Sequence, residues 1–178
     1  MGYMHLDQYV IKHNMVAKAM WKVDNSLTLV GSGDFDAQSK SLTNNLEDGG
    51  NRVRGWSEGL LEDCAENMNL ISEHFYCGRL PWNQQQRIDL VSHVAQIKDM
   101  IKKKADQHRN LQAKMPNLKG RIIPIALDEW NYWHRDYVYG DLGCVYDLAD
   151  ALGIAAGIHE LYRQADMIQI ATYAQTVN

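Results

Sequence analysis

Two kinds of apolar pattern alternate along this chain. In four segments the apolar side chains recur at three- and four-residue steps, which is typical of helices that bury one face. These predicted helices span residues 6–23, 56–67, 84–113 and 145–161. Short apolar runs predict strands at residues 27–30, 68–76, 122–127 and 167–173. Such strict alternation of helices and strands predicts an α/β fold with a parallel sheet.

The predicted strand at residues 122–127 is a nearly continuous apolar run rich in β-branched side chains, which indicates burial on both faces. Pro124 cannot donate to a strand ladder, so we expect irregular pairing there. The run ends at Asp128 and Glu129, and the alternation of strand side chains predicts that these acids point to opposite faces. In α/β barrels the catalytic residues lie in this position, at the C-terminal ends of the strands. Acids that simply meet solvent at a strand end give the same pattern.

Three other features have plain structural interpretations. The Gly31-Ser32-Gly33 sequence after the first predicted strand lacks the third glycine of a dinucleotide-binding loop, so it predicts an ordinary turn. Residues 39–54 are polar and contain a glycine pair, which predicts an extended loop around at most a short helix. The run Lys102–Lys104 within the third predicted helix indicates a solvated face.

Polar and aromatic side chains follow three of the predicted strands. His74 and Tyr76 end the second strand, Glu129 and Trp133 follow the third, and Gln175 follows the fourth. Because the carboxyl ends of parallel strands lie at one edge of a sheet, we expect these groups to converge there. This convergence is a stronger indication of a site than any one residue.

Composition and charge argue against some classes of function but do not identify one. The chain has 178 residues, 46% hydrophobic and 22% charged, as expected for a single globular domain. A net charge of −4 gives no basic surface for nucleic acid or anionic membranes, and no apolar run approaches the ~20 residues of a membrane span. Three widely spaced cysteines and no recognisable signal peptide favour a reducing, cytoplasmic location.

The remaining motifs exclude several chemistries. Seven histidines are scattered without metal-ligand spacing, and the nucleophile motif G-x-S-x-G does not occur. We therefore expect neither a metal nor another cofactor. The chemistry that remains is catalysis by carboxylates on a polar, ring-shaped substrate. Aromatic side chains would then stack on the sugar ring. For Trp130 and Trp133 the alternative is packing in the core.

The hexapeptide Asp128–Trp133 resembles the D-E-W-N-x-W signature of the α-L-arabinofuranosidases of glycoside hydrolase family 51. Further similarity lies at Val23–Gly31, at Ser72–Tyr76 and at Ala174–Asn178, in the same order as in that family. The resemblance implies a partial (β/α)8 TIM barrel of about four β/α units, corresponding to strands 5–8. Residues 1–178 are then a fragment of a catalytic domain, without the N-terminal half-barrel and the C-terminal β-sandwich.

The resemblance also implies roles for individual residues. Glu129 matches the catalytic nucleophile, and Tyr76 matches the tyrosine that hydrogen-bonds it. Trp133 and Gln175 match substrate-binding positions, and His74 is a neighbour of the nucleophile on the same face as Tyr76. The implied activity is retaining, exo-acting release of terminal arabinofuranosyl groups from arabinan- or arabinoxylan-type glycans, in a full-length parent that forms a homo-oligomer.

One part of the family's machinery has no counterpart in this sequence. The acid/base of family 51 lies in a Gly-Asn-Glu motif, which does not occur here, so we expect the chain alone to be nearly inactive. Two alternatives stay open. The chain is a non-catalytic fragment that binds glycans or completes a barrel with another chain, or an endo-glycanase on the same scaffold.

Overall fold

The computed structural model describes residues 4–36, 38–40, 53–78, 88–133 and 145–174. Its helices follow the apolar spacing closely. They are α1 (Leu6–Val23), α2 (Trp56–Asp63), α3 (Leu90–Gln112) and α4 (Leu148–Arg163), with short 3₁₀ turns η1 (Ala65–Asn67) and η3 (Pro116–Leu118). The predicted helices are thus confirmed, with α2 ending earlier and α3 beginning later than the pattern indicated.

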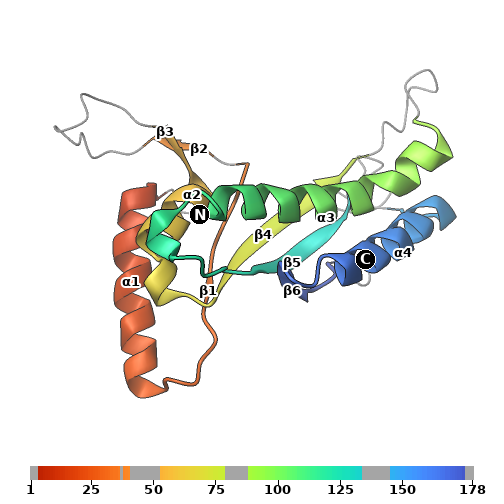
Figure 1. Cartoon of the computed structure of the whole chain (residues 1–178). Helices are drawn as coiled ribbons and strands as arrows, with labels where there is room; N and C mark the ends of the chain where they lie inside the picture. The colour runs from red at the N-terminus through yellow and green to blue at the C-terminus, as the bar shows by residue number, and fades with distance from the viewer. Residues whose placement is uncertain (1–3, 37, 41–52, 79–87, 134–144, 175–178) are drawn as a thin grey trace. The chain divides into compact units, whose positions relative to one another are not determined.

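Four strands form the main sheet in the order β1-β4-β5-β6 (Figure 1). They are β1 (Val30–Gly31), β4 (Leu70–Cys77), β5 (Ile125–Tyr132) and β6 (Ile168–Ala171). β1 pairs with β4 in parallel, Val30 opposite Leu70. A mixed α/β fold with a parallel sheet is therefore confirmed.

A second, two-stranded sheet was not predicted. β2 (Gln38–Lys40) and β3 (Val53–Gly55) pair antiparallel, Ser39 opposite Arg54. The prediction of a loop around at most a short helix was wrong at these residues. Three-residue strands with polar sequences are too short to show an apolar alternation, so the sequence carried no strand signal.

The strand β5 lies further along the chain than the apolar run indicated. Pro124 precedes it, and its carbonyl accepts a hydrogen bond of 3.0 Å from the amide of Ile71. The strand then continues through Asp128 and Glu129 to Tyr132. The expectation that the acids follow the end of the strand was wrong, because Trp130, Asn131 and Tyr132 are buried and extend it.

The chain divides into two units, of residues 1–73 with 108–126 and of residues 74–107 with 127–178. In the first unit a buried carboxylate organises a loop. Glu73 accepts hydrogen bonds from the Ser57 hydroxyl (2.6 Å) and the Phe35 amide (3.0 Å), and its Oε1 lies 2.9 Å from Nε2 of His108. Glu73, Ser57 and His108 are fully buried, so they hold the turn after β1 from inside the unit.

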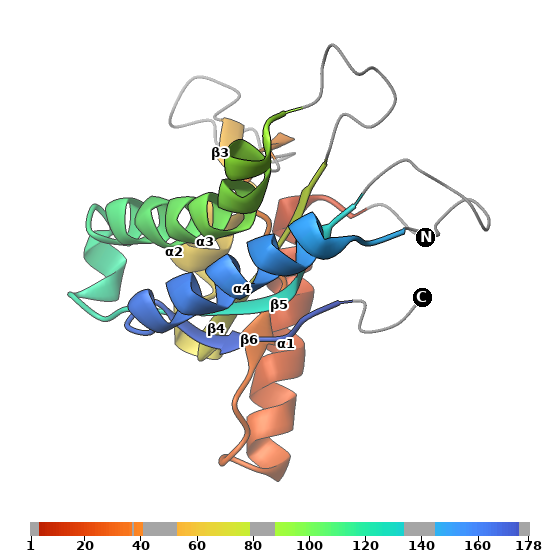
Figure 2. The same ribbon diagram turned by 90° about the vertical axis from the view of Figure 1, so that its right-hand side faces the viewer.

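In the second unit α3 and α4 pack closely beside each other (Figure 2). A Cβ on Gly157 of α4 would lie 2.4 Å from Cγ2 of Ile97 on α3. Nε2 of His93 lies 2.8 Å from Oδ1 of Asp150, and both side chains are buried. Tyr132 stacks on His93 with ring centroids 4.5 Å apart and donates a hydrogen bond to its carbonyl, which anchors the end of β5 to α3.

The lysine run on α3 is only partly solvated. Lys102 and Lys103 are exposed, as expected, but Lys104 is 1% exposed. It lies three residues after Ile101 and seven after Ile97, so helical periodicity places it on the buried face. The prediction was wrong for this one residue.

The contact between α4 and β5 yields a prediction. A Cβ on Gly153 would lie 1.9 Å from the Tyr132 hydroxyl oxygen. Helix propensity alone predicts that Gly153→Ala stabilises the protein by about 1 kcal/mol. We expect instead a loss of roughly 1–3 kcal/mol, because overpacking displaces Tyr132. Urea unfolding measures the difference, with the exposed Ala151→Gly on the same helix as control for propensity. A gain in stability would contradict this packing.

Candidate active site

The predicted site residues of β4 and β5 meet in the second unit. His74 and Tyr76 are alternate residues of β4 and share one face. The Tyr76 hydroxyl donates a hydrogen bond of 2.5 Å to Oε1 of Glu129 on β5. Nδ1 of His74 lies 3.7 Å from Oε2 of the same carboxylate. The structure therefore brings these three residues together, as the sequence predicted.

His74 contacts a second carboxylate as well. Its Nε2 lies 3.1 Å from Oδ1 of Asp128, so one imidazole faces both acids. The side chains of all three are 42–49% exposed. The expectation that Asp128 and Glu129 point apart was wrong for their charged ends. Alternation fixes the Cα–Cβ directions, whereas longer side chains can turn along the sheet toward the neighbouring strand.

The environment of Tyr76 keeps it a hydrogen-bond donor. Burial is the largest cause that raises the pKa of Tyr76, followed by its hydrogen bond to Glu129 and the negative charge of that carboxylate. Since the pKa lies above the ordinary tyrosine value, the phenol keeps its proton across the physiological pH range. One oxygen of Glu129 is thus held in a fixed direction.

The two tryptophans of the hexapeptide differ in their surroundings. Trp133 is partly exposed and meets Tyr76 edge-on, with ring centroids 5.1 Å apart. Trp130 is 2% exposed and lies between Phe75 and Tyr173, at centroid distances of 6.4 and 5.5 Å. Trp130 is therefore a core residue, and the interpretation as a sugar platform is wrong for it. Trp133 borders the carboxylate side of the site.

Gln175, the remaining predicted site residue, lies outside the described residues. The sequence analysis did not single out Tyr146 and Tyr173, whose hydroxyls both bond the side chain of Asn131. No periodic signal identifies them, because they lie in the irregular segments before α4 and after β6. The sequence hinted at this network of hydroxyl groups only through Asn131, which aromatic residues flank on both sides.

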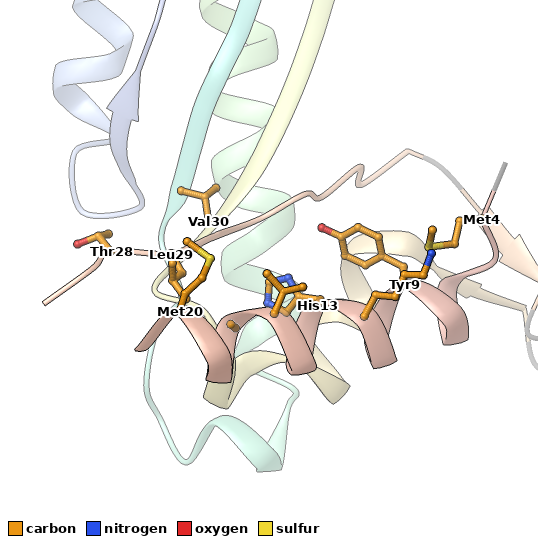
Figure 3. A pocket seen from close by; sticks show the side chains of 10 residues that line it. Met4, Tyr9, His13, Met20, Thr28, Leu29 and Val30 are labelled. Carbon is orange, nitrogen blue, oxygen red and sulfur yellow. The ribbon is translucent and has the colours of Figure 1, made fainter. Parts of the chain in front are cut away.

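The first unit has an apolar pocket of about 500 Å³ along α1. Figure 3 shows Tyr9, His13 and Met20 of α1 facing Leu29 and Val30. None of the predicted site residues lines it.

Within the described ranges, no helix is long and apolar enough to cross a membrane. The same ranges hold no group of three or more His, Cys, Asp or Glu side chains placed for a metal ion.

Comparison with known proteins finds similarity to α-L-arabinofuranosidases. A sequence model described as the α-L-arabinofuranosidase C-terminal domain matches residues 128–178. An intracellular exo-α-(1→5)-L-arabinofuranosidase of Bacillus subtilis is 27% identical over 99% of this chain and 34% of its own length. A protein of that name from Acetivibrio thermocellus is 24% identical, again over 99% of this chain and 35% of its own length.

Solved structures show the same relationship in the fold. The α-L-arabinofuranosidase of Thermotoga maritima, in complex with arabinose, matches 99% of this chain and 31% of its own at a TM-score of 0.73 and 23% identity. A family 51 α-L-arabinofuranosidase from Bifidobacterium longum matches 99% of this chain and 35% of its own at a TM-score of 0.71 and 22% identity. This chain is thus similar to α-L-arabinofuranosidases in sequence and in fold. It spans about a third of the length of these relatives.

The pairing of Tyr76 with Glu129 predicts a pH effect on stability. The folded state holds the Tyr76 proton more tightly than the unfolded chain, because the pKa is raised. This contribution is complete below the ordinary tyrosine pKa of about 10 and is lost as pH rises above that value. We expect the free energy of unfolding of the wild type to fall more steeply than that of Tyr76→Phe between pH 9 and 11.

Urea unfolding at several pH values measures this difference. Cys64 and Cys77, whose pKa values burial raises to about 12, add an alkaline decrease common to both proteins. Tyr162→Phe is the matched control, since Tyr162 is 77% exposed. If the free energies of unfolding of wild type and Tyr76→Phe fell in parallel with pH, the raised pKa of Tyr76 would be contradicted.

Proposed function

We propose that this chain carries the nucleophile half of a retaining exo-α-L-arabinofuranosidase. The observation that carries the proposal is the 2.5 Å hydrogen bond from Tyr76 to Glu129, with His74 beside the same carboxylate. A glutamate that is half exposed, fixed in direction and flanked by an aromatic side chain has what a glycosidase nucleophile needs. The relationship to enzymes that are named for this activity supports the substrate class.

The nucleophilic step follows from the arrangement of the two Glu129 oxygens. Tyr76 binds Oε1, so the lone pairs of Oε2 remain directed toward the side where His74 lies. Oε2 attacks the anomeric carbon, the glycosidic C–O bond breaks, and a glycosyl ester of Glu129 forms. The Tyr76 phenol stays on the carboxyl group throughout and orients it. Trp133 and Gln175 contact the sugar, and no cofactor takes part.

On a natural glycoside both steps need a second carboxyl group, which we do not assign within this chain. A retaining glycosidase uses a carboxyl group about 5–5.5 Å from the nucleophile, first as acid for the leaving oxygen and then as base for water. In family 51 this group lies in a Gly-Asn-Glu motif, which the sequence does not contain. We propose that this carboxyl group lies in the portion of the longer relatives that this chain does not match.

The same proposal extends to architecture and setting. The described helices and strands are about four β/α units of a (β/α)8 barrel, and the glycan substrate carries terminal arabinofuranosyl groups. The word "intracellular" in the names of the curated relatives supports a cytoplasmic setting. The parent protein is expected to be a homo-oligomer.

The proposal predicts a covalent intermediate that stops at one turnover. A dinitrophenyl α-L-arabinofuranoside has a leaving group that departs without protonation, so the first step needs no acid. We expect one dinitrophenolate released per protein molecule, followed by little further release, because no base activates water. Mass spectrometry should find one arabinosyl group on the peptide that contains Glu129.

Two variants test the assignment. Glu129→Gln should abolish both the burst and the adduct, whereas Glu66→Gln, at an exposed glutamate of the first unit, should leave both unchanged. An adduct on another residue would remove Glu129 from its role. The absence of a burst in the wild-type chain would count against the function itself.

A further inference from the structure

A buried amide near the carboxylate joins β5 to the segments before α4 and after β6. Asn131 follows Glu129 by two residues on β5 and is fully buried. Its Oδ1 accepts a hydrogen bond of 3.1 Å from the Tyr173 hydroxyl and one of 2.7 Å from the Tyr132 amide. Its Nδ2 donates one of 3.0 Å to the Tyr146 hydroxyl. One side chain thus binds two segments that are distant in sequence.

Both tyrosines are held by more than Asn131. The Tyr146 hydroxyl donates in turn to the Tyr132 carbonyl at 3.2 Å. Next to Tyr173, the Thr172 amide donates to the Leu127 carbonyl at 3.0 Å, and the Thr172 hydroxyl donates to the Asp128 carbonyl at 2.6 Å. The segments before α4 and after β6 are therefore fastened to β5 along the stretch that carries Glu129.

These segments reach the groups around the carboxylate. After burial and Glu129, Tyr146 is a further cause of the raised pKa of the Tyr76 phenol. Tyr173 lies edge-on to Trp130, the residue next to Glu129. Asn131 is fully buried and bonds Tyr146 and Tyr173, so we expect it to act on the carboxylate through these neighbours.

We infer that Asn131 is a positioning residue: it holds Tyr146 and Tyr173 against β5 and thereby sets the surroundings of the Tyr76–Glu129 pair. The inference rests on the proposed function for its effect on the reaction. It goes beyond that function by assigning a role to a fully buried residue that bonds Tyr146 and Tyr173. Small displacements of a reacting group cost large factors in rate, so a loosened anchor should slow the covalent step.

Hydrogen exchange tests the anchoring without any substrate. The Asp147 amide, bonded to Asp150 at 2.9 Å, reports on the segment of Tyr146, and the Thr172 amide reports on the segment of Tyr173. Loss of one hydrogen bond of about 1 kcal/mol corresponds to about fivefold faster exchange. We expect Tyr146→Phe to accelerate Asp147 alone, Tyr173→Phe to accelerate Thr172 alone, and Asn131→Leu to accelerate both.

The covalent step with the dinitrophenyl arabinofuranoside tests the consequence. We expect Asn131→Leu to lower the maximal rate of Glu129 modification at least about tenfold, while the half-saturating sugar concentration changes less than about twofold. Gln112→Leu is the matched control. It removes another buried amide, which bonds the backbone of Ile123 in the first unit, so it should change neither readout at equal loss of stability.

The outcomes separate this inference from the proposed function. Unchanged exchange at Asp147 and Thr172 in Asn131→Leu overturns the anchoring role. Faster exchange with an unchanged covalent step overturns the role in the reaction. If the wild type forms no adduct, the proposed function fails, and the branch-specific exchange pattern alone then confirms or overturns Asn131 as the anchor. The two phenylalanine variants keep the test decisive if Asn131→Leu does not fold.

Discussion

A hydrogen bond between a phenol on β4 and a carboxylate on β5 depends on the register of the two strands. A slip by one residue would turn Glu129 to the other face and leave Tyr76 without its acceptor. Near the ends of the strands the Trp133 amide donates to the Cys77 carbonyl at 2.8 Å, which fixes the pairing beyond the site. On the opposite face Phe75 packs with Trp130. Backbone pairing and core packing therefore both determine where the carboxylate lies.

Buried polar groups stabilise this arrangement from the helix side. The close pair of His93 and Asp150 joins α3 to α4, and Tyr132 stacks on the same imidazole. Removing one partner of such a pair leaves a buried polar group without its hydrogen bond, which costs about 1–3 kcal/mol. Asp150 also accepts from the Asp147 amide at the start of α4. The first turns of α3 and α4 and the end of β5 are thus one connected structure within the second unit.

The sequence predicted the fold class because apolar periodicity distinguishes helices from buried strands. It predicted the meeting of His74, Tyr76 and Glu129 because parallel strands bring equivalent positions to one edge. It failed at β2 and β3, whose pairing is set by partners in space rather than by a local pattern. It also failed for Lys104, where helix geometry outweighs the usual exposure of lysine, and for Trp130, which aromatic type alone cannot assign to core or surface. The Asn131 network depends on side chains from three segments, so no single stretch of sequence encodes it.

The central claim is that the Tyr76 hydroxyl holds Glu129 in the orientation for attack. The most direct measurement is the rate of arabinosyl ester formation on Glu129 in Tyr76→Phe, compared with wild type at saturating activated arabinofuranoside. A hydrogen bond to a charged group is worth about 1.5–3 kcal/mol, so the account predicts a covalent step roughly ten- to a hundredfold slower in a protein that remains folded. Equal rates in the two proteins would contradict it.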